Sequence, residues 1–464
     1  MIATDLPTRP LPGPRGLDNL RRVRQLFSDL APALDELHTT YGPICRLGGP
    51  GMRIVVMGDP SMIQEMFSTK VDHFRWKHKF NVVGVRFVVG KRSMIVSDGA
   101  HHQRRRGAVQ KAFTRPRLNS WAPMIIDRTD AAIDHLVSGL AERPSERPVD
   151  LYPVGRELIL GVTLHAFFGE RLAQRAAEFS DLFQRAQAFI EKPGFNQLPH
   201  PFPFTSRSRV RADRRRIDEI IDEEVAERRA RPTGNPRDIL EVVANDGTLT
   251  DAEIRDQADT LIGAGYDTTA ATFAWVLWCA GLDENVWSRL RDEADRVLGP
   301  LEGPRPGMAD TLLTQLEFAQ RVVHESLRLH PAGLIAARVT ADDVRIGDHV
   351  IQKGTLIAWS PYLAGRDPYT WSDPERFHPD RYLQLTDEQR AIADRAWVPF
   401  GRGPHMCLGF ALAQMELVLM IARFAQRLDL TPTSDEAPKP IGMVVNRPIG
   451  GAPFHVRARA TVGQ

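Results

Sequence analysis

A short glycine-rich stretch that contains a cysteine constrains this chain more than any other feature of its 464 residues. Residues 400–409 read Phe-Gly-Arg-Gly-Pro-His-Met-Cys-Leu-Gly, and the glycines let the backbone turn tightly and lie close to a flat group. Apolar side chains then follow at helical spacing, which places Cys407 at a predicted helix N-terminus. Unpaired amides and the positive end of the helix dipole stabilise a thiolate there. Taken alone, the stretch fits a metal-ligating thiolate and a small buried cysteine about equally well.

Two upstream motifs favour the metal-ligating thiolate. Glu325 and Arg328 lie three residues apart, on one face of a predicted helix that Pro331 ends. An apolar helical run at residues 261–275 is interrupted by an acid and an alcohol, in the order Ala-Gly-Tyr-Asp-Thr. In this chain order the three motifs resemble those of the cytochrome P450 family of haem-thiolate monooxygenases. The resemblance runs from about residue 12 to the C-terminus.

The resemblance implies a single-domain cytochrome P450 fold, mainly α with a small β-rich part (α+β), with haem between the distal oxygen-binding helix and the cysteine-ligand helix. We expect a proline-rich N-terminal leader over residues 1–16 and one haem-thiolate monooxygenase domain over residues 17–464. Residues 374–399 are predicted to be irregular. Predicted helices cover residues 21–41, 116–140, 153–191, 207–231 and 316–330, and predicted strands cover residues 44–47, 53–57, 344–346 and 355–359.

Composition argues against several other classes of protein. The net charge of +2, with no basic run interleaved with aromatic residues, gives no indication of nucleic-acid binding. Cys45, Cys279 and Cys407 are too few and too widely spaced for a disulfide framework or a zinc cluster, which indicates a reducing compartment. The first 17 residues lack the apolar core of a secretory signal or membrane anchor, and Asp267 makes residues 261–282 a buried core helix rather than a membrane span. We therefore expect a cytoplasmic protein of the soluble bacterial type, without a transmembrane anchor.

The resemblance also implies which residues hold the cofactor, haem b (iron protoporphyrin IX). Cys407 is expected to be the axial ligand of the iron, and Phe400 to pack on the ligand side of the haem. A thiolate ligand pushes electron density onto iron and so favours cleavage of the O–O bond. The remaining contacts that the resemblance implies are Gly409 and the propionate partners His102, Arg106, Arg338 and His405, the last in place of the more common arginine.

Oxygen activation is assigned by the resemblance to the interrupted helix. Ala264 and Gly265 are expected to let the backbone approach the distal side of the iron. Thr268 would hydrogen-bond bound dioxygen, and Asp267 would feed protons toward it through water. The structural alternatives are a threonine bonded to its own helix and an acid paired with an arginine.

Charged residues elsewhere are given structural roles. Glu325 and Arg328 are expected to form a buried triad with Arg376, which would pin residues 374–399 in place. Arg104 and Arg105 are expected to lie on a solvated basic patch.

The expected activity is hydroxylation or epoxidation, with dioxygen, of an apolar small molecule of the fatty acid, terpenoid, steroid or polyketide class. The expected electron donor is a separate ferredoxin or flavodoxin with its reductase, because the chain ends soon after the haem domain. A peroxide-using peroxygenase of the same family and a non-catalytic haem-binding or gas-sensing protein are the alternatives. The acid–alcohol pair argues against the first, and no attached effector domain supports the second. Candidate pocket residues, each equally compatible with the core, are Phe80, Phe87, Phe183, Phe189, Phe195, Leu334, Ile335 and Val444.

Overall fold

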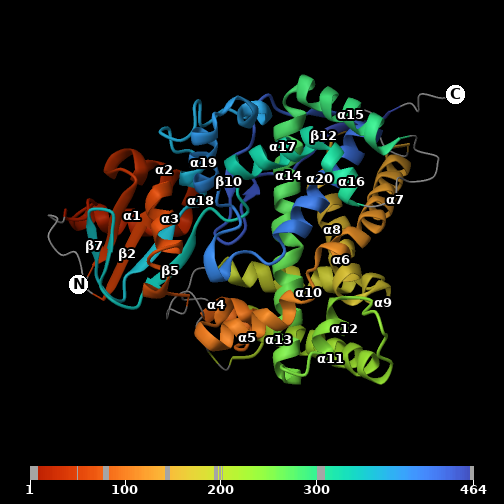
Figure 1. The fold of residues 1–464 in the computed structure, drawn as a ribbon, viewed down its shortest axis with the longest axis horizontal. Helices are drawn as coiled ribbons and strands as arrows, with labels where there is room; N and C mark the ends of the chain where they lie inside the picture. The colour runs from red at the N-terminus through yellow and green to blue at the C-terminus, as the bar shows by residue number, and fades with distance from the viewer. Residues whose placement is uncertain are drawn as a thin grey trace.

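A large helical part and a smaller sheet-rich part make up the molecule, which we describe from a computed structural model (Figure 1). The structure describes residues 9–49, 51–76, 83–141, 147–192, 197, 200, 202–299 and 309–459. The described helices are α1 (Gly16–Ser28), α2 (Leu30–Tyr41), α3 (Pro60–Phe67), α4 (Val83–Val89), α5 (Gly99–Gln110), α6 (Arg115–Ser120), α7 (Ala122–Ala141), α8 (Leu151–Phe168), α9 (Glu170–Ala173), α10 (Ala176–Ile190), α11 (Ser206–Ala230), α12 (Ile239–Ala244), α13 (Asp251–Gly265), α14 (Asp267–Gly281), α15 (Glu284–Leu298), α16 (Ala309–Gln315), α17 (Glu317–Leu329), α18 (Pro361–Ala364), α19 (Asp387–Ala396) and α20 (Phe410–Arg427). The described strands are β1 (Ile44–Gly49), β2 (Met52–Met57), β3 (Phe74–Arg75), β4 (Val149–Asp150), β5 (Ala336–Thr340), β6 (Val344–Ile346), β7 (His349–Ile351), β8 (Leu356–Trp359), β9 (Leu428–Pro432), β10 (Pro440–Ile441), β11 (Arg447–Pro448) and β12 (Pro453–Ala458).

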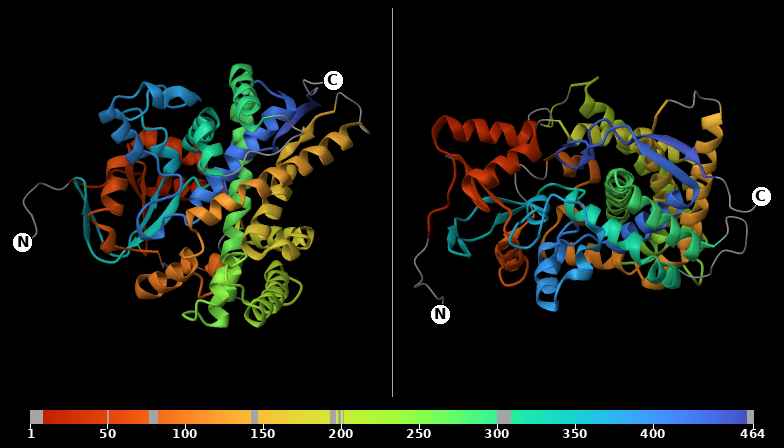
Figure 2. Two further views of the ribbon diagram at one scale, coloured as in Figure 1. Left: turned by 45° about the vertical axis from the view of Figure 1, so that its right-hand side comes forward. Right: turned by 90° about the horizontal axis from the view of Figure 1, so that it is seen from above.

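The sheet-rich part is built on a five-stranded sheet with the strand order β1-β2-β8-β5-β3. Strands β2 and β8 run parallel, with Ile54 opposite Leu356, and the other neighbours are antiparallel. Alternate residues of β2 face opposite sides: Ile54 packs with α1 and α2, while Val55 packs with α3. Helices therefore cover both faces of this sheet. Both views in Figure 2 show this part beside the helices rather than among them.

The helical part is organised around α14, which runs through the middle of the molecule in line with α13 (Figure 1). Nearly every residue of α14 is buried, as expected of a helix that is apolar on all sides. Helices α8, α17 and α20 pack around it. The predicted core helix over residues 261–282 is largely buried, but it is divided at Tyr266 between α13 and α14. Among the described residues, no helix combines the length and apolar character needed to cross a bilayer.

Several predicted elements match, and others are divided in the structure: the predicted helix over residues 153–191 is α8, α9 and α10, and that over residues 116–140 is α6 and α7. The predicted strands correspond to β1, β2, β6 and β8. The predicted helix over residues 21–41 is two helices, because the chain leaves helical geometry at Asp29 (φ −152°). Residues 374–399 are not wholly irregular, since they hold a 3₁₀ helix (Pro379–Gln384) and α19, which Thr386 caps in a capping box.

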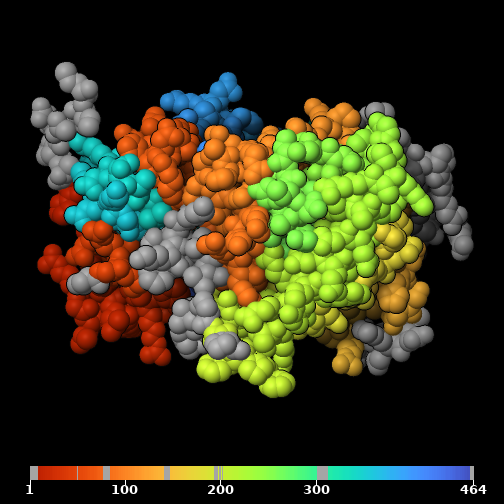
Figure 3. Space-filling model, turned by 90° about the horizontal axis from the view of Figure 1, so that it is seen from below, coloured from red at the N-terminus to blue at the C-terminus, as the bar shows by residue number. Residues whose placement is uncertain are grey.

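Ion pairs join the helices on the face seen in Figure 3, where α4 and α5 (orange) lie against α11 and α13 (yellow-green and green). Arg104 and Arg105 both donate to Glu253 on α13, the second over 2.9 Å, and Arg214 pairs with Asp256. Glu253 is almost completely buried. Arg104 and Arg105 therefore anchor α5 to α13; Arg104 is exposed, as expected of a solvated basic patch, whereas Arg105 is half-buried.

Candidate functional site: the cavity between the cysteine loop and the distal helix

One cavity brings together the cysteine loop and the interrupted helix. Cys407 and Phe400 line it from one side, and Ala264, Gly265 and Thr268 line it from the junction of α13 and α14. These two groups of residues are more than 130 positions apart in the sequence. The remaining lining residues that matter below are Trp76, Ile95, Phe167, Arg338, Ile335, His405, Gly409, Glu416 and Val444.

The cysteine loop is held by its own backbone. The amide of Cys407 donates to the carbonyl of Phe400 over 2.9 Å, and Gly401 and Gly403 adopt φ values of +68° and +70°, which favour glycine. Helix α20 begins three residues after Cys407, with Gly409 as its N-cap residue. Burial raises the pKa of the Cys407 thiol, against which the Gly409 amide and the Arg106 guanidinium act. Although the thiol lies inside the protein, it is exposed to the cavity that it lines, so it is placed to bind a group there.

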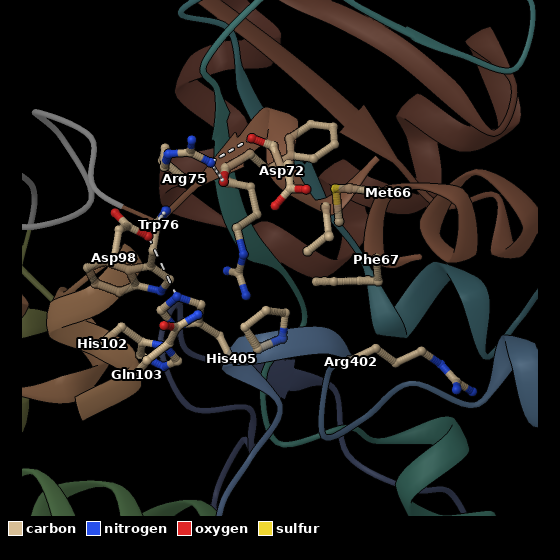
Figure 4. A pocket seen from close by; sticks show the side chains of 15 residues that line it. Met66, Phe67, Asp72, Arg75, Trp76, Asp98, His102, Gln103, Arg402 and His405 are labelled. Atoms are coloured by element: carbon tan, nitrogen blue, oxygen red, sulfur yellow. Dashed lines mark hydrogen bonds and ion pairs between the residues drawn. The ribbon is translucent and has the colours of Figure 1, made fainter. Parts of the chain in front are cut away.

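Cationic and imidazole side chains meet at the edge where the cavity adjoins a second pocket (Figure 4), which shares Trp76, Arg338 and His405 with it and is also lined by His102. The rings of His102 and His405 stack with their centroids 3.9 Å apart, and Asp98 lies 3.6 Å from Nε2 of His405 (Figure 4). Burial lowers the pKa of His102 to about 4 and that of Arg338 to about 10. Burial also lowers the pKa of Arg106. This edge therefore concentrates donors and positive charge.

The residues present fit a haem. Among the described residues, neither Arg106 nor Arg338 forms an ion pair; Arg338 donates only to the carbonyl of Ala337. Arg338 is buried and Arg106 is half-buried; the charge of Asp98 favours ionised Arg338, but burial outweighs it. The two propionates of a haem would supply closer counter-charges. The thiol that faces the cavity supplies an axial ligand for iron, and the apolar lining suits the faces of the macrocycle.

The distal helix is broken where it meets the cavity. Tyr266 separates α13 from α14, and threonine hydroxyls near the junction donate to helix carbonyls four residues back. Thr268 Oγ1 donates to the carbonyl of Ala264 over 2.7 Å, and Thr269 Oγ1 donates to that of Gly265 over 2.9 Å. A Cβ on Gly265 would lie 3.2 Å from Thr163, so this glycine also allows α8 to approach. The cavity is lined by Ala264, Gly265 and Thr268, as the sequence predicts. The hydroxyl of Thr268 is bonded to its own helix, which is the structural alternative given above for this residue.

Asp267 does not line the cavity. Its carboxylate is buried and lies 3.2 Å from Nε of Arg156 on α8. Burial raises the pKa of Asp267, and the charge of Arg156 opposes that rise. The arrangement matches the acid–arginine pair named above as its alternative. Direct delivery of protons from this carboxylate into the cavity stays a prediction that the observed side-chain position does not favour.

The buried charge cluster around Glu325 has a different third member from the predicted one. Glu325 and Arg328 form a fully buried pair with 2.8 and 2.9 Å hydrogen bonds. The second cation is Arg381, whose Nε lies 3.0 Å from Oε1 of Glu325. The prediction of Arg376 is wrong: its side chain is exposed, and only its carbonyl joins the cluster by accepting from Arg328 and Arg381.

The predicted substrate residues divide into lining and core. Ile335 and Val444 line the cavity. Phe87 and Phe189 pack together in a small apolar cluster, and Phe183 belongs to the main helical core. Leu334 is buried against α1 and α2. These four are core residues, so their prediction as pocket residues is wrong, and Phe80 and Phe195 lie outside the described residues.

Sequence reasoning missed Glu416, which lines the cavity from α20. Only 2% of the residue is exposed, and its Oε1 has no hydrogen-bond partner among the described residues. Burial raises the pKa of Glu416 to about 8, so its carboxyl is mainly protonated at neutral pH. The sequence did contain a signal for this residue, because Glu416 is an acid within a mainly apolar helical run.

Comparisons with known proteins agree with this geometry. The family model described as Cytochrome P450 matches residues 12–451. The chain is 30% identical over 403 residues to a putative cytochrome P450 139 of Mycobacterium tuberculosis, covering 86% of this chain and 90% of that protein. It is 32% identical over 358 residues to a cyclooctat-9-en-7-ol 5-monooxygenase of Streptomyces melanosporofaciens, covering 73% of each chain.

A solved structure of the same fold extends the agreement to three dimensions. Retinoic acid-bound cyanobacterial CYP120A1 superimposes with a TM-score of 0.81, covering 98% of this chain and 100% of that one at 21% identity. The predicted fold is confirmed. With the cysteine loop, the distal helix break and the cationic edge around one cavity, the chain belongs to the cytochrome P450 family, as a monooxygenase whose cofactor is haem.

Proposed function

We propose that this monooxygenase hydroxylates or epoxidises an apolar, carbon-rich small molecule, and that terpenoids are the first substrate class to test. The observation that carries the proposal is the apolar lining of the cavity on the side of the distal helix. Its apolar side chains are those of Trp76, Ile95, Phe167, Ala264, Ile335 and Val444, and Thr163, Thr268, Thr269 and Thr272 add hydroxyl groups beside the distal helix. Such a lining binds by burial of apolar surface, at about 25 cal/mol per Å², and offers few polar contacts to fix orientation.

The relatives support the terpenoid class. Two proteins of Streptomyces melanosporofaciens, 32% and 29% identical to this chain, are named a cyclooctat-9-en-7-ol 5-monooxygenase and a cyclooctatin synthase. Fatty acids, steroids and polyketides are the other classes that an apolar cavity suits.

The proposed roles of the residues follow from their positions. A bound haem supplies dioxygen activation and one-electron chemistry. Cys407 would hold the iron, and the amide of Gly409 would stabilise the thiolate by a hydrogen bond. His102, Arg106, Arg338 and His405 would hold the propionates at the cationic edge.

Proton supply to the substrate side is proposed to pass through Thr268. Its Oγ1 donates to the carbonyl of Ala264, which leaves its lone pairs to accept a hydrogen bond from a water in the cavity. Asp267 is paired with Arg156 away from the cavity. It would transfer a proton toward the cavity only when the ion pair between Asp267 and Arg156 separates. Glu416 holds a proton at neutral pH on the other side of the cavity.

The proposed electron donor is a ferredoxin or flavodoxin with its reductase, and the proposed compartment is the cytoplasm. Three free thiols, of which one must remain available to the cofactor, are compatible with a reducing compartment.

Substrate class is tested by titrating the purified holoprotein with a panel of terpenoid alcohols, fatty acids and steroids. We expect terpenoids to shift the Soret band at micromolar concentration and to yield oxygenated product with NADPH, a ferredoxin and its reductase. Shifts confined to fatty acids or steroids would contradict the terpenoid proposal. Equal product from hydrogen peroxide without the reductase would instead favour the peroxygenase alternative.

A further inference from the structure

The loop between β10 and β11 brings Val444 to the cavity. Residues 442–446 connect the two short strands, and Gly442 has a φ of +110°, which allows the tight turn after β10. The carbonyl of Val444 lies 3.9 Å from the position that a Cβ on Gly333 would take, so this loop contacts the segment after α17. The depth at which Val444 enters the cavity therefore depends on what holds the loop.

Glu191, at the C-terminal end of α10, holds one side of the loop. Its Oε2 accepts from the amide of Met443 over 2.9 Å, and its Oε1 accepts from the amides of Val444 and Val445 over 3.3 Å each. The guanidinium of Arg447 lies 3.8 Å away and adds a favourable charge. Only a side chain with two acceptor oxygens can serve all three amides, because an amide side chain would direct an NH₂ group at one of the donors.

Asn446 holds the other side of the loop. Its amide donates to the carbonyl of Ala332 over 2.8 Å, and its Nδ2 donates to that of Pro331 over 3.0 Å. Its own carbonyl accepts from the indole of Trp275 on α14. This anchor is almost completely buried, with 1% of Asn446 exposed, so it is fixed to the helical core.

The two anchors differ in what they are attached to. Asn446 binds the core, whereas Glu191 follows the last residue of α10 and thus ties the loop to the end of that helix. The carboxylate bonds only backbone amides of the loop, so it sets the position of the loop whatever side chain stands at position 444.

We infer that Glu191 is a positioning residue for substrate recognition, which fixes the loop of residues 442–446 and so sets the size of ligand that the cavity accepts beside Val444. The inference rests on the proposed function, because it takes the cavity as the substrate site. Loss of the three amide contacts lets Val444 withdraw and enlarges this end of the cavity.

The test measures ligand discrimination in the holoprotein. Imidazole and 4-phenylimidazole both bind haem iron through nitrogen, but only the second extends a bulky apolar group into the cavity. For Glu191→Gln and Glu191→Ala we expect the ratio of the imidazole Kd to the 4-phenylimidazole Kd, read from the Soret shift, to rise about tenfold. Glu178→Gln, a change on the same helix at a half-buried residue that pairs with Arg175 and Arg216 and not with the loop, should leave the ratio unchanged.

A double-mutant cycle identifies the route of the effect. Val444→Ala should raise the same ratio, and Glu191→Ala added to it should have little further effect, because both act on one side chain. Equal changes in both dissociation constants, or additive effects of the two substitutions, would overturn the inference and leave the proposed function standing. Absence of any azole-induced Soret shift in the wild-type protein would instead refute the proposed function itself.

Discussion

Replacement of Arg381 tests the corrected charge cluster around Glu325. Arg381 donates a 3.0 Å hydrogen bond to Glu325. It also donates to the backbone carbonyls of Ser372, Asp373 and Arg376, which lie in the segment before the cysteine loop. Burial alone would oppose ionisation of Glu325, but the bonds from its arginine partners outweigh it and hold the pKa of Glu325 below its usual value. The Arg381→Ala change therefore removes one of two cations from a fully buried carboxylate and leaves three carbonyls without this donor.

The expected loss of stability is large. Removing one partner of a buried ion pair costs about 3–5 kcal/mol, and the remaining arginine keeps the value for Arg381→Ala near the lower end of that range. Arg376→Ala is the matched control, since its side chain is exposed and its carbonyl is retained. Surface changes of this kind stay within about 0.5 kcal/mol.

The assay is urea unfolding of the holoprotein, followed by the Soret band and by far-ultraviolet circular dichroism. We expect a lower unfolding midpoint and a lower haem content for Arg381→Ala, and wild-type behaviour for Arg376→Ala. Equal losses in the two variants, or a change below about 0.5 kcal/mol for Arg381→Ala, would refute the assignment of Arg381 to the cluster.

The remaining predictions concern the cavity and the α5–α13 contact. Burial raises the pKa of Glu416 from 4.5 to about 8, so between these values the folded protein holds a proton that the unfolded chain releases, and the wild type loses stability as pH rises from about 4.5 to 8. Glu416→Gln has no such proton, so its melting temperature should fall less over that range; parallel pH profiles would contradict this. The hydrogen bond from Arg104 holds the pKa of Glu253 at about 2, so the ionised Glu253 stabilises the fold above about pH 4.5 and this stabilisation is lost as pH falls toward 2. The difference in melting temperature between wild type and Glu253→Gln should therefore close over that range. A difference that stays constant would refute this role of Glu253. Arg338→Leu should weaken haem binding at least about tenfold in titrations of apoprotein, because one propionate partner is lost, and unchanged affinity would exclude Arg338 from that role. Thr268→Ala should keep NADPH oxidation but divert it to hydrogen peroxide, and unchanged coupling would argue against Thr268 in proton supply.

The sequence was sufficient where local chemistry decides the structure. The glycines of the cysteine loop take positive φ values that favour this residue, and the apolar run after them can only be a buried helix. The pairing of Glu325 with Arg328 follows from helical spacing alone. In their chain order, these local features carry the family resemblance from which the cofactor and its axial ligand were predicted.

The errors occurred where long-range packing decides. Arg376 and Arg381 are five residues apart in a segment whose turns have no periodicity, so the sequence does not say which guanidinium turns inward. Phe183 and Phe189 lie on the buried side of α10, but that side contacts core residues as well as the neighbourhood of the cavity. Asp267 pairs with Arg156 of α8, more than 100 residues away, and such a long-range contact cannot be read from the local pattern.

The two helix ends that meet at the cavity have opposite polarity, and this suits the two faces of a haem. At the start of α20, unpaired amides and the positive end of the dipole face the sulfur of Cys407, and the Gly409 amide already donates to it. At the break after α13, the exposed groups are carbonyls, and Thr268 and Thr269 satisfy those of Ala264 and Gly265 with hydroxyl hydrogens. A hydroxyl donor can rotate, whereas a backbone amide in a helix cannot. The chain thus fixes its donors rigidly on the thiolate side and provides movable ones on the side where protons must be transferred.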